Sequence, residues 1–177
     1  MRVSSAMAVS LAVVAALGVA APAPAAARPH AVSAQAAETP APAAAQRARS
    51  LRTVDAFYRA LQAKDIDRFA TLWTRDAVYR VPVTPQGVPG ATVGRDAIVS
   101  GIGDFFRLFG ETRFTWRAEP MLDPRRVMAT WTLDIELVAG GTYRNRGVAI
   151  FHMDGDRIAD FTEYFDTAAF LKAFGTG

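Results

Sequence analysis

Residues 113–165, RFTWRAEPMLDPRRVMATWTLDIELVAGGTYRNRGVAIFHMDGDRIADFTEYF, decide the fold of this chain. They form four long segments rich in β-branched and aromatic residues, separated by short turns that contain Asp-Pro, Gly-Gly or Asp-Gly. This pattern predicts an antiparallel sheet whose strands follow one another along the chain. The expected strands are Arg113–Met121, Val127–Val138, Thr142–Met153 and Arg157–Phe165.

Upstream of these strands, the spacing of apolar residues changes to that of helices. Between Leu51 and Leu61 they recur every three or four positions, which predicts an amphipathic helix over residues 50–63 with Ser50 as its N-cap. A second, short helix is expected directly afterwards. Asp65 can cap it, and its apolar face would run from Ile66 to Trp73.

Three further elements complete the expected order. The segment Ala77–Val81 alternates as a strand does, and Pro82 ends it. After an irregular loop over residues 82–94, a third helix opens near Gly94 with an apolar stripe that reaches Phe109. A last helix, Thr167–Phe174, follows Asp166, whose carboxylate is expected to cap it.

The order of these elements predicts the fold class. Helices first and long strands afterwards indicate an α+β domain, in which a strongly curved, mostly antiparallel sheet wraps around three N-terminal helices. We expect a cone-shaped fold with a short C-terminal helix. A sheet curved in this way can leave a cavity between itself and the helices.

The N-terminal region has the composition of an export signal. Met1 and Arg2 precede a largely apolar run over residues 6–20, and small residues follow up to Ala27. We expect a cleavable secretory signal peptide over residues 1–27, with an uncleaved membrane anchor as the alternative, because the run is short for a membrane span. Residues 28–49 are rich in Ala and Pro and are expected to be a flexible tether. The domain would then cover residues 50–177, in the periplasm or outside the cell.

Charge and composition exclude several functions. Of the 20 Lys and Arg residues, Arg2, Arg28 and Arg47 precede Ala48, as does Glu38 among the 17 acidic ones, so the remainder carries a net charge of only +1. The basic residues are scattered, and we expect no nucleic-acid partner. The chain has no cysteine and two histidines, so neither a metal site nor a cofactor is expected.

Glu163 is the strongest candidate for a functional residue. Strand alternation places it on the same face as Phe161 and Phe165, and a carboxyl group among phenylalanines loses hydration. Its pKa should then rise toward neutrality, as acid–base catalysis requires. The alternative is a structural ion pair between Glu163 and an arginine.

Other polar residues carry weaker signals. Tyr79 can donate a hydrogen bond to a bound oxygen, or simply pack its ring in the core. Asp134 alternates with Thr132 and Glu136, opposite the apolar positions of its strand, so it faces either the cavity or the outer side of the sheet. His152 is the only histidine in the domain and is expected to be a packed or hydrogen-bonded residue.

Several motifs in one order resemble the SnoaL-like members of the nuclear transport factor 2-like superfamily. They extend through most of residues 51–174, and they are Ala63-Lys64-Asp65-Ile66-Asp67, Asp76-Ala77-Val78-Tyr79, Val93-Gly94-Arg95-Asp96-Ala97-Ile98, Asp154-Gly155-Asp156-Arg157-Ile158 and Glu163-Tyr164-Phe165-Asp166. The superfamily includes ketosteroid isomerases, polyketide cyclases, limonene epoxide hydrolases, phenazine biosynthesis proteins and binding proteins without catalytic activity.

The resemblance implies different roles for different residues. Phe57 and Val81 stand where the ketosteroid isomerase pattern has its tyrosine and its base, so that chemistry is not expected. Glu163 and Tyr79 match the base and the tyrosine of the limonene epoxide hydrolase pattern. That pattern's asparagine falls on Val81, and its arginine and acid fall near Thr132 and Asp134 only if a gap is allowed.

The resemblance and the residues together suggest a function. The catalytic residues would be Glu163, Tyr79 and Asp134, and the residues expected to line an apolar pocket are Phe57, Trp73, Val81, Phe161 and Phe165. We expect a small hydrophobic or polycyclic ligand and cofactor-independent cyclase, isomerase or epoxide hydrolase chemistry. The alternative is a ligand-binding or dimerisation module without turnover, and relatives of this fold suggest a homodimer.

Overall fold

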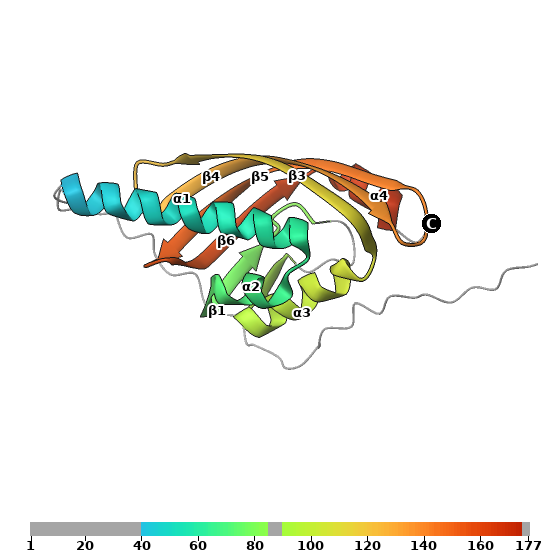
Figure 1. The fold of residues 1–177 in the computed structure, drawn as a ribbon, viewed down its shortest axis with the longest axis horizontal. Coiled ribbons are helices and arrows are strands. Elements are labelled where there is room, and N and C mark those ends of the chain that lie inside the picture. The colour runs from blue at the N-terminus through green and yellow to red at the C-terminus, as the bar shows by residue number, and fades with distance from the viewer. Residues whose placement is uncertain (1–39, 85–89, 175–177) are drawn as a thin grey trace, which may run out of the picture. The chain divides into compact units, whose positions relative to one another are not determined.

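The computed structural model describes residues 40–84 and 90–174, which contain four helices and six strands (Figure 1). Within these residues, no helix is both long and apolar enough to cross a membrane. The expected signal peptide and most of the expected tether lie outside the described residues. The elements in chain order are α1 (Pro40–Ala63), α2 (Ile66–Thr71), β1 (Trp73–Arg80), β2 (Ala91–Val93), α3 (Arg95–Phe106), β3 (Phe109–Pro120), β4 (Arg126–Leu137), β5 (Thr142–Asp154), β6 (Arg157–Phe165) and α4 (Thr167–Phe174).

The six strands form one sheet in the order β2-β1-β6-β5-β4-β3. β3, β4, β5 and β6 pair antiparallel as consecutive neighbours, which confirms the predicted succession of hairpins. β1 pairs with β6 in parallel and with β2 antiparallel. In Figure 1, α1, α2 and α3 lie on one side of this sheet. The prediction of an α+β fold with a mostly antiparallel sheet and a short C-terminal helix is confirmed.

The first helix is longer than the sequence pattern indicated. It begins at Pro40 rather than at Ser50, and Ser50 is not an N-cap but a buried residue in its middle. The Ala-rich segment has high helix propensity, and prolines are tolerated in a first turn. Tertiary contacts also anchor it: the Gln46 side chain donates to the Gly155 carbonyl at 2.7 Å, and the Ser50 hydroxyl donates to the Pro124 carbonyl at 3.0 Å.

Three other boundaries differ from prediction. Trp73 begins β1 instead of ending the second helix, and it pairs with Ile158 of β6. The expected loop over residues 82–94 contains β2, which pairs with the end of β1. The third helix ends at Phe106, and Phe109 already belongs to β3. These boundaries depend on pairing with neighbouring strands. Periodicity within a segment does not indicate such pairing.

The helix caps predicted at Asp65 and Asp166 are confirmed. The Asp65 carboxylate accepts a hydrogen bond from the Arg68 backbone N–H at 2.9 Å and so caps α2. The Asp166 carboxylate accepts one from the Ala169 backbone N–H at 3.0 Å and so caps α4. Asp166 is therefore a structural residue.

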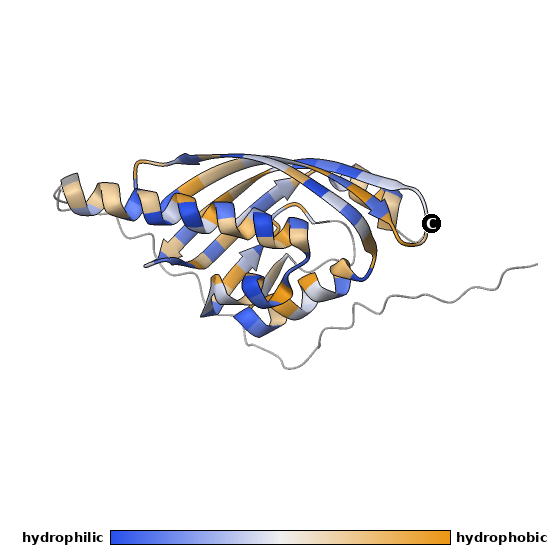
Figure 2. Ribbon diagram, viewed as in Figure 1, coloured by the Kyte–Doolittle hydropathy of each residue, from blue (hydrophilic) through white to orange (hydrophobic). Residues whose placement is uncertain are grey.

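The core lies between the helices and the face of the sheet that they cover, which we call the concave face. Hydropathy alternates along the long strands, as Figure 2 shows, because successive side chains point to opposite faces. Phe57 of α1 is the centre of an aromatic cluster whose ring centroids lie 5.1 to 6.1 Å from its own: Tyr58, Phe69, Trp73, Phe151 and Phe161.

Residues of neighbouring strands form rows across the concave face. One row consists of Glu163, Ala149, Ala129 and Ala118, which pair in this order from β6 to β3. We call it the alanine row. The next row consists of Phe165, Gly147, Trp131 and Trp116. Small residues beside Glu163 thus lie between rows of large aromatic ones.

Candidate functional site

A hydrogen-bonded pair, Tyr79 and Glu163, occupies the concave face where β1 and β6 run in parallel. The Tyr79 hydroxyl donates to a Glu163 carboxylate oxygen at 2.6 Å. The Tyr79 ring also packs on Phe161, with ring centroids 4.9 Å apart. Both members of the pair remain partly accessible, whereas the neighbouring Phe161 is fully buried. The structure therefore brings together two residues that the sequence selected separately, and Glu163 lies on the expected face.

The Glu163 carboxyl group is poorly hydrated. Burial raises its pKa from 4.5 to about 7, although the hydrogen bond from Tyr79 acts in the opposite direction. Burial, followed by the charge of Glu163, also raises the pKa of Tyr79 well above its usual value. Tyr79 therefore stays protonated near neutral pH, while Glu163 can exchange a proton there. No arginine is paired with Glu163 in the described residues, which argues against a structural ion pair.

The charge of the Glu163 carboxylate also contributes to the raised pKa values of two further tyrosines, Tyr58 and Tyr143. The pKa of Tyr58, on α1, is raised by burial and then by the Glu163 charge. Burial raises the pKa of Tyr143 to about 12, and the Glu163 charge contributes in the same direction. The Tyr143 hydroxyl accepts a hydrogen bond from the Asn145 side chain, which also binds both backbone groups of Asp166. Asn145 thus fixes the β6–α4 junction beside the site.

The Trp131 indole packs directly against Gly147 of β5, which is possible because Gly147 has no side chain. A Cβ atom at Gly147 would lie 2.6 Å from Cζ2 and 2.8 Å from Cε2 of the Trp131 indole. The indole is therefore folded over β5 with the edge that carries Nε1 against the glycine. Among the described residues, neither the Trp131 Nε1–H nor the Tyr58 hydroxyl has a hydrogen-bond partner, and both atoms are buried.

Aromatic side chains from α3, β3, β6 and α4 cover the end of the concave face beyond Trp131. Phe105 lies 6.0 to 6.2 Å from Phe109, Phe170 and Phe174, measured between ring centroids. Phe165 lies 5.7 Å from Phe170. All five phenylalanines are partly buried, so this aromatic cap presents apolar surface next to a titratable carboxyl group.

The expectation that Asp134 could join the site is wrong. The Asp134 side chain lies on the outer face of β4 and is 47% exposed. One of its carboxylate oxygens forms an ion pair with Arg144, at 2.8 Å from Nε. The strand period of two explains this, since Leu133 and Ile135 occupy the concave face. His152 also belongs to the outer face, directly across from Asp160 of β6.

The expected pocket residues are mostly core residues. Phe57, Trp73 and Phe161 contact one another and are at most 4% exposed, and Val81 is 8% exposed. Only Phe165 of this predicted set is partly accessible. The correction has a packing reason: aromatic rings at this end of the sheet fill the space between α1, α2 and β6.

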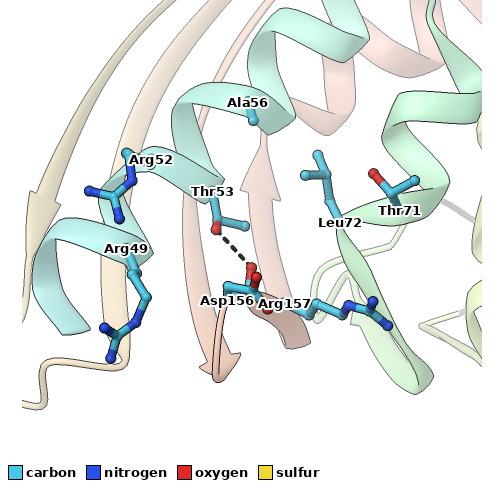
Figure 3. A pocket seen from close by; sticks show the side chains of 8 residues that line it. All are labelled: Arg49, Arg52, Thr53, Ala56, Thr71, Leu72, Asp156 and Arg157. Atoms are coloured by element: carbon cyan, nitrogen blue, oxygen red, sulfur yellow. Dashed lines mark hydrogen bonds between the residues drawn. The ribbon is translucent and has the colours of Figure 1, made fainter. Parts of the chain in front are cut away.

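Two surface pockets formed by described residues lie away from Glu163. One, of about 360 Å³, lies between α1, the α2–β1 junction and the β5–β6 turn, with Arg49, Arg52 and Arg157 on its rim (Figure 3). There the Thr53 hydroxyl donates to the Asp156 carbonyl at 2.8 Å. The other, of about 390 Å³, lies beside the β4–β5 turn and α4. Glu163 lines neither pocket.

Metal-binding groups do not gather in the described part of the chain. Across residues 40–84 and 90–174, no three His, Asp or Glu side chains are placed to share one ion. The groups near Glu163 are phenols, an indole and an amide, which suit hydrogen bonding rather than metal coordination.

Sequence reasoning did not select Tyr58, Trp131, Tyr143 or Asn145 for the site. Tyr143 and Asn145 share the strand face of Phe151, so the same alternation that selected Glu163 could have found them. Tyr58 and Trp131 belong to the aromatic core. They are buried, and only the tertiary structure reveals that their polar atoms lack partners.

Comparison with known proteins gives the family. The model of the SnoaL-like domain family matches residues 54–161. The uncharacterized protein YesE from Bacillus subtilis (strain 168) is 25% identical over 132 residues, which cover 72% of this chain and 88% of YesE. A crystal structure of a Bacillus subtilis protein proposed to be an isomerase has a TM-score of 0.69 and 24% identity, and the match covers 74% of this chain and 96% of that one.

More distant crystal structures share the fold. A phenazine biosynthesis-related protein from Pseudomonas aeruginosa has a TM-score of 0.66 and 17% identity, with 77% of this chain and 92% of that one covered. Two others were obtained with ligands. TerC was co-crystallised with polyporic acid (TM-score 0.58, 20% identity, 70% and 96% covered). RV0760c from Mycobacterium tuberculosis is in complex with estradiol-17beta-hemisuccinate (TM-score 0.60, 19% identity, 68% and 96% covered). The chain belongs to the SnoaL-like domain family and has the cone-shaped nuclear transport factor 2-like fold.

Proposed function

We propose that this protein binds a small hydrophobic or polycyclic molecule on the concave face of its sheet and transfers a proton to or from it through Glu163. The observation that carries the proposal is the hydrogen-bonded Tyr79–Glu163 pair, in which burial raises the carboxyl pKa to about 7. A group with this pKa is half ionised near neutral pH and can act both as base and as acid. Tyr79 would orient the carboxylate and the substrate.

The surroundings of Glu163 favour isomerisation or cyclisation over epoxide hydrolysis. Hydrolysis needs a base for water and an acid for the leaving oxygen, and Asp134, the second carboxylate considered, lies on the outer face. A single carboxyl group can remove a proton from carbon and return it at another position, because the same group serves both steps. No cofactor is required for this chemistry.

The ligand class is supported by two observations. Phe165 lies in the row next to Glu163 and contacts Phe170 of the aromatic cap, and both rings are partly accessible, which suits a flat apolar molecule. Proteins of the same fold were crystallised with polyporic acid and with an estradiol derivative. We therefore expect a multi-ring ketone or phenol.

Deuterium exchange tests the catalytic proposal without knowledge of the natural substrate. The protein is incubated with 1-tetralone in D₂O, and NMR follows loss of the protons next to the carbonyl. We expect catalysed exchange whose kcat/KM rises with pH through about 7, and Glu163→Gln should lower it at least about 100-fold. Asp134→Asn is the control and should leave the rate unchanged. Exchange no faster than in buffer would reject Glu163 as the base for this ketone class.

A binding or dimerisation module remains the second candidate function. Met128, Val148, Ile150 and Tyr164 form a partly apolar patch on the outer face, and 44% of Tyr164 is exposed. We propose that a second copy of the chain covers this patch. Light scattering should then give the mass of a dimer, and Val148→Glu should give that of a monomer. A monomeric wild-type protein would reject this proposal.

Export is a separate proposal that rests on the N-terminal sequence alone. We propose that residues 1–27 direct secretion and are removed. Mass spectrometry of the protein recovered outside the cytoplasm should find a new N-terminus at Arg28. An intact Met1 on the exported protein would favour the membrane anchor.

A further inference from the structure

We infer that the surface pocket between α1, the α2–β1 junction and the β5–β6 turn is a second binding site, for a small organic molecule that carries a phosphate monoester group. We call it the arginine pocket, because Arg49, Arg52 and Arg157 are among the residues that line it. Glu163 does not line this pocket, so the inference does not depend on the proposed function.

The arginines of this pocket have no acidic partner. Eight other arginines of the described residues form ion pairs with an Asp or Glu side chain. Within the same residues, Arg49, Arg52 and Arg157 form no ion pair, and Arg49 donates only to the Gln46 amide oxygen, at 2.7 Å. Each guanidinium group carries five N–H donors, so most of these donors remain available to a ligand.

The fold gathers these positive charges around one hollow. Arg49 and Arg52 are three positions apart on one face of α1, where like charges repel each other. Arg157 begins β6, far along the chain, and Figure 3 shows it on the opposite side of the pocket from the other two. Asp156 supplies the one acidic side chain of the lining, which therefore has a net charge of +2. A ligand with two negative charges would neutralise it.

Hydrogen bonds hold the walls of the arginine pocket in place. The buried Thr53 hydroxyl of α1 donates to the Asp156 carbonyl in the β5–β6 turn at 2.8 Å (Figure 3). The Ile158 backbone N–H of β6 donates to the Leu72 carbonyl at the α2–β1 junction, also at 2.8 Å. The three walls are thus joined to one another. A site that is formed before its ligand enters binds more tightly, because little ordering is needed on binding.

A phosphate monoester complements the pocket in charge and in size. Guanidinium groups bind phosphate oxygens through pairs of parallel hydrogen bonds. A phosphate monoester has a second pKa of about 6, so it carries close to two negative charges at about pH 7.5. The pocket volume, about 360 Å³, falls within the range of roughly 300 to 1,000 Å³ that holds small organic ligands. Ala56 and Leu72 add apolar wall, which suits a small ring attached to the phosphate.

Phenyl phosphate is the probe for this site. It is titrated into ¹⁵N-labelled protein at about pH 7.5, where it is close to a dianion, and NMR follows the amide signals of Thr53, Asp156 and Arg157. We expect these signals to shift until saturation, with an affinity at least about fivefold higher than that for inorganic phosphate. Arg52→Gln and Arg157→Gln should each weaken the binding of phenyl phosphate at least about fivefold.

The matched control is Arg117→Gln, which makes an equal change of charge on the edge strand β3. Its side chain is 80% exposed and does not line the pocket. At an ionic strength of about 0.1 M, charges farther apart than about 10 Å are largely screened, so this variant should change the affinity less than about twofold. A loss as large as that of Arg52→Gln would mean that the arginines attract anions only in general, and it would overturn the inference.

Two further substitutions test the pocket itself. Asp156→Asn removes the acidic side chain but keeps the carbonyl that Thr53 binds, so it should strengthen binding about twofold to fivefold. Ala56→Leu fills the hollow without a change of charge and should weaken the binding of phenyl phosphate at least about tenfold. Thermal midpoints show whether each variant is folded. An unchanged affinity in folded Ala56→Leu would reject the pocket as the site.

The source of the phosphate group is tested separately. A lipid headgroup carries the same chemistry, so vesicles with phosphatidic acid are compared with phenyl phosphate. Binding to the vesicles without binding of phenyl phosphate would assign the arginines to a membrane surface and overturn the inference. Glu163→Gln should leave the affinity for phenyl phosphate unchanged. Failure of phenyl phosphate to bind would therefore reject the arginine pocket alone, and failure of deuterium exchange would reject only the proposed proton transfer.

Discussion

The two faces of the sheet give carboxyl groups opposite environments. On the concave face, Glu163 has a phenol as its partner and small or aromatic neighbours, and its pKa is raised to about 7. On the outer face, Asp134 and Asp160 form ion pairs with Arg144 and Arg80 at 2.8 and 2.9 Å, and these side chains are about one third to three quarters exposed. Asp160 lies on β6 with Glu163, and Asp134 lies on β4, which β5 separates from β6.

This contrast shows that position, rather than residue type, determines the chemistry. A carboxylate in water with an arginine partner keeps its charge, and such exposed pairs contribute little to stability. A carboxyl group that is shielded from water and accepts a hydrogen bond from only one tyrosine loses the preference for its charged form. Asp160 and Glu163 are only a few residues apart on β6, but the pleat of the strand points them to opposite faces. One is therefore an exposed ion-paired carboxylate and the other a shielded carboxyl group.

The largest expected effect tests how tightly the concave face is packed. Gly147→Ala would place a methyl group against the Trp131 indole and the Tyr164 carbonyl, both of which belong to the packed sheet. We expect the free energy of unfolding to fall by about 3 kcal/mol or more, measured by urea denaturation.

The matched control is Gly101→Ala in α3, where no atom lies within 4 Å of the new methyl group. This exposed helical substitution should be neutral or stabilise by about 0.5 to 1 kcal/mol. Equal losses in both variants would contradict the packing of Trp131 against Gly147.

The pH dependence of stability tests the difference between the faces directly. A carboxyl group whose folded pKa lies above its unfolded pKa stabilises the protein below the unfolded value, and this contribution disappears as pH rises through the folded pKa. For Glu163 the window runs from about 4.5 to about 7. Wild-type protein should therefore lose roughly 2 to 3 kcal/mol between pH 5 and pH 8 relative to Glu163→Gln. Parallel stability curves for the two proteins would contradict the raised pKa.

Removal of the Tyr79 hydroxyl should sharpen the same contrast. The hydrogen bond from Tyr79 lowers the pKa of Glu163, so Tyr79→Phe should raise that pKa further. We expect a stability loss of about 1 to 2 kcal/mol at pH 8 and a smaller one at pH 5, where Glu163 is protonated. The ¹³C shift of the Glu163 carboxyl carbon, followed against pH, measures the change. A titration midpoint that moves down would contradict the hydrogen bond.

The smallest effect is expected on the outer face. Asp134→Asn removes the ion pair with Arg144, whose two side chains are 47% and 74% exposed. Urea denaturation should show a change within about 0.5 kcal/mol that decreases further at high salt. A loss comparable to that of Tyr79→Phe would mean that the two faces do not differ as described.

The sequence predicted the strands well because their signals are local. Alternation and the turns at Asp123-Pro124, Gly140-Gly141 and Asp154-Gly155 are visible in any short window, and β6 and α4 have the predicted bounds. The start of α1 and the whole of β2 were missed, because contacts with turns and with β1 stabilise these segments. Periodicity within a segment does not report such distant partners.

The fold class, the caps at Asp65 and Asp166, and the face on which Glu163 lies could be predicted, because each follows from residues near one another in the chain. Three facts came from the tertiary structure alone: Tyr79 meets Glu163, Asp134 faces away, and the buried polar atoms of Tyr58 and Trp131 have no partner among the described residues. These facts depend on the parallel pairing of β1 with β6 and on the packing of α1 over the sheet. Tyr79 and Glu163 are 84 positions apart, and Gln62 of α1 bonds Phe114 of β3 across 52 positions, distances over which a local pattern carries no information.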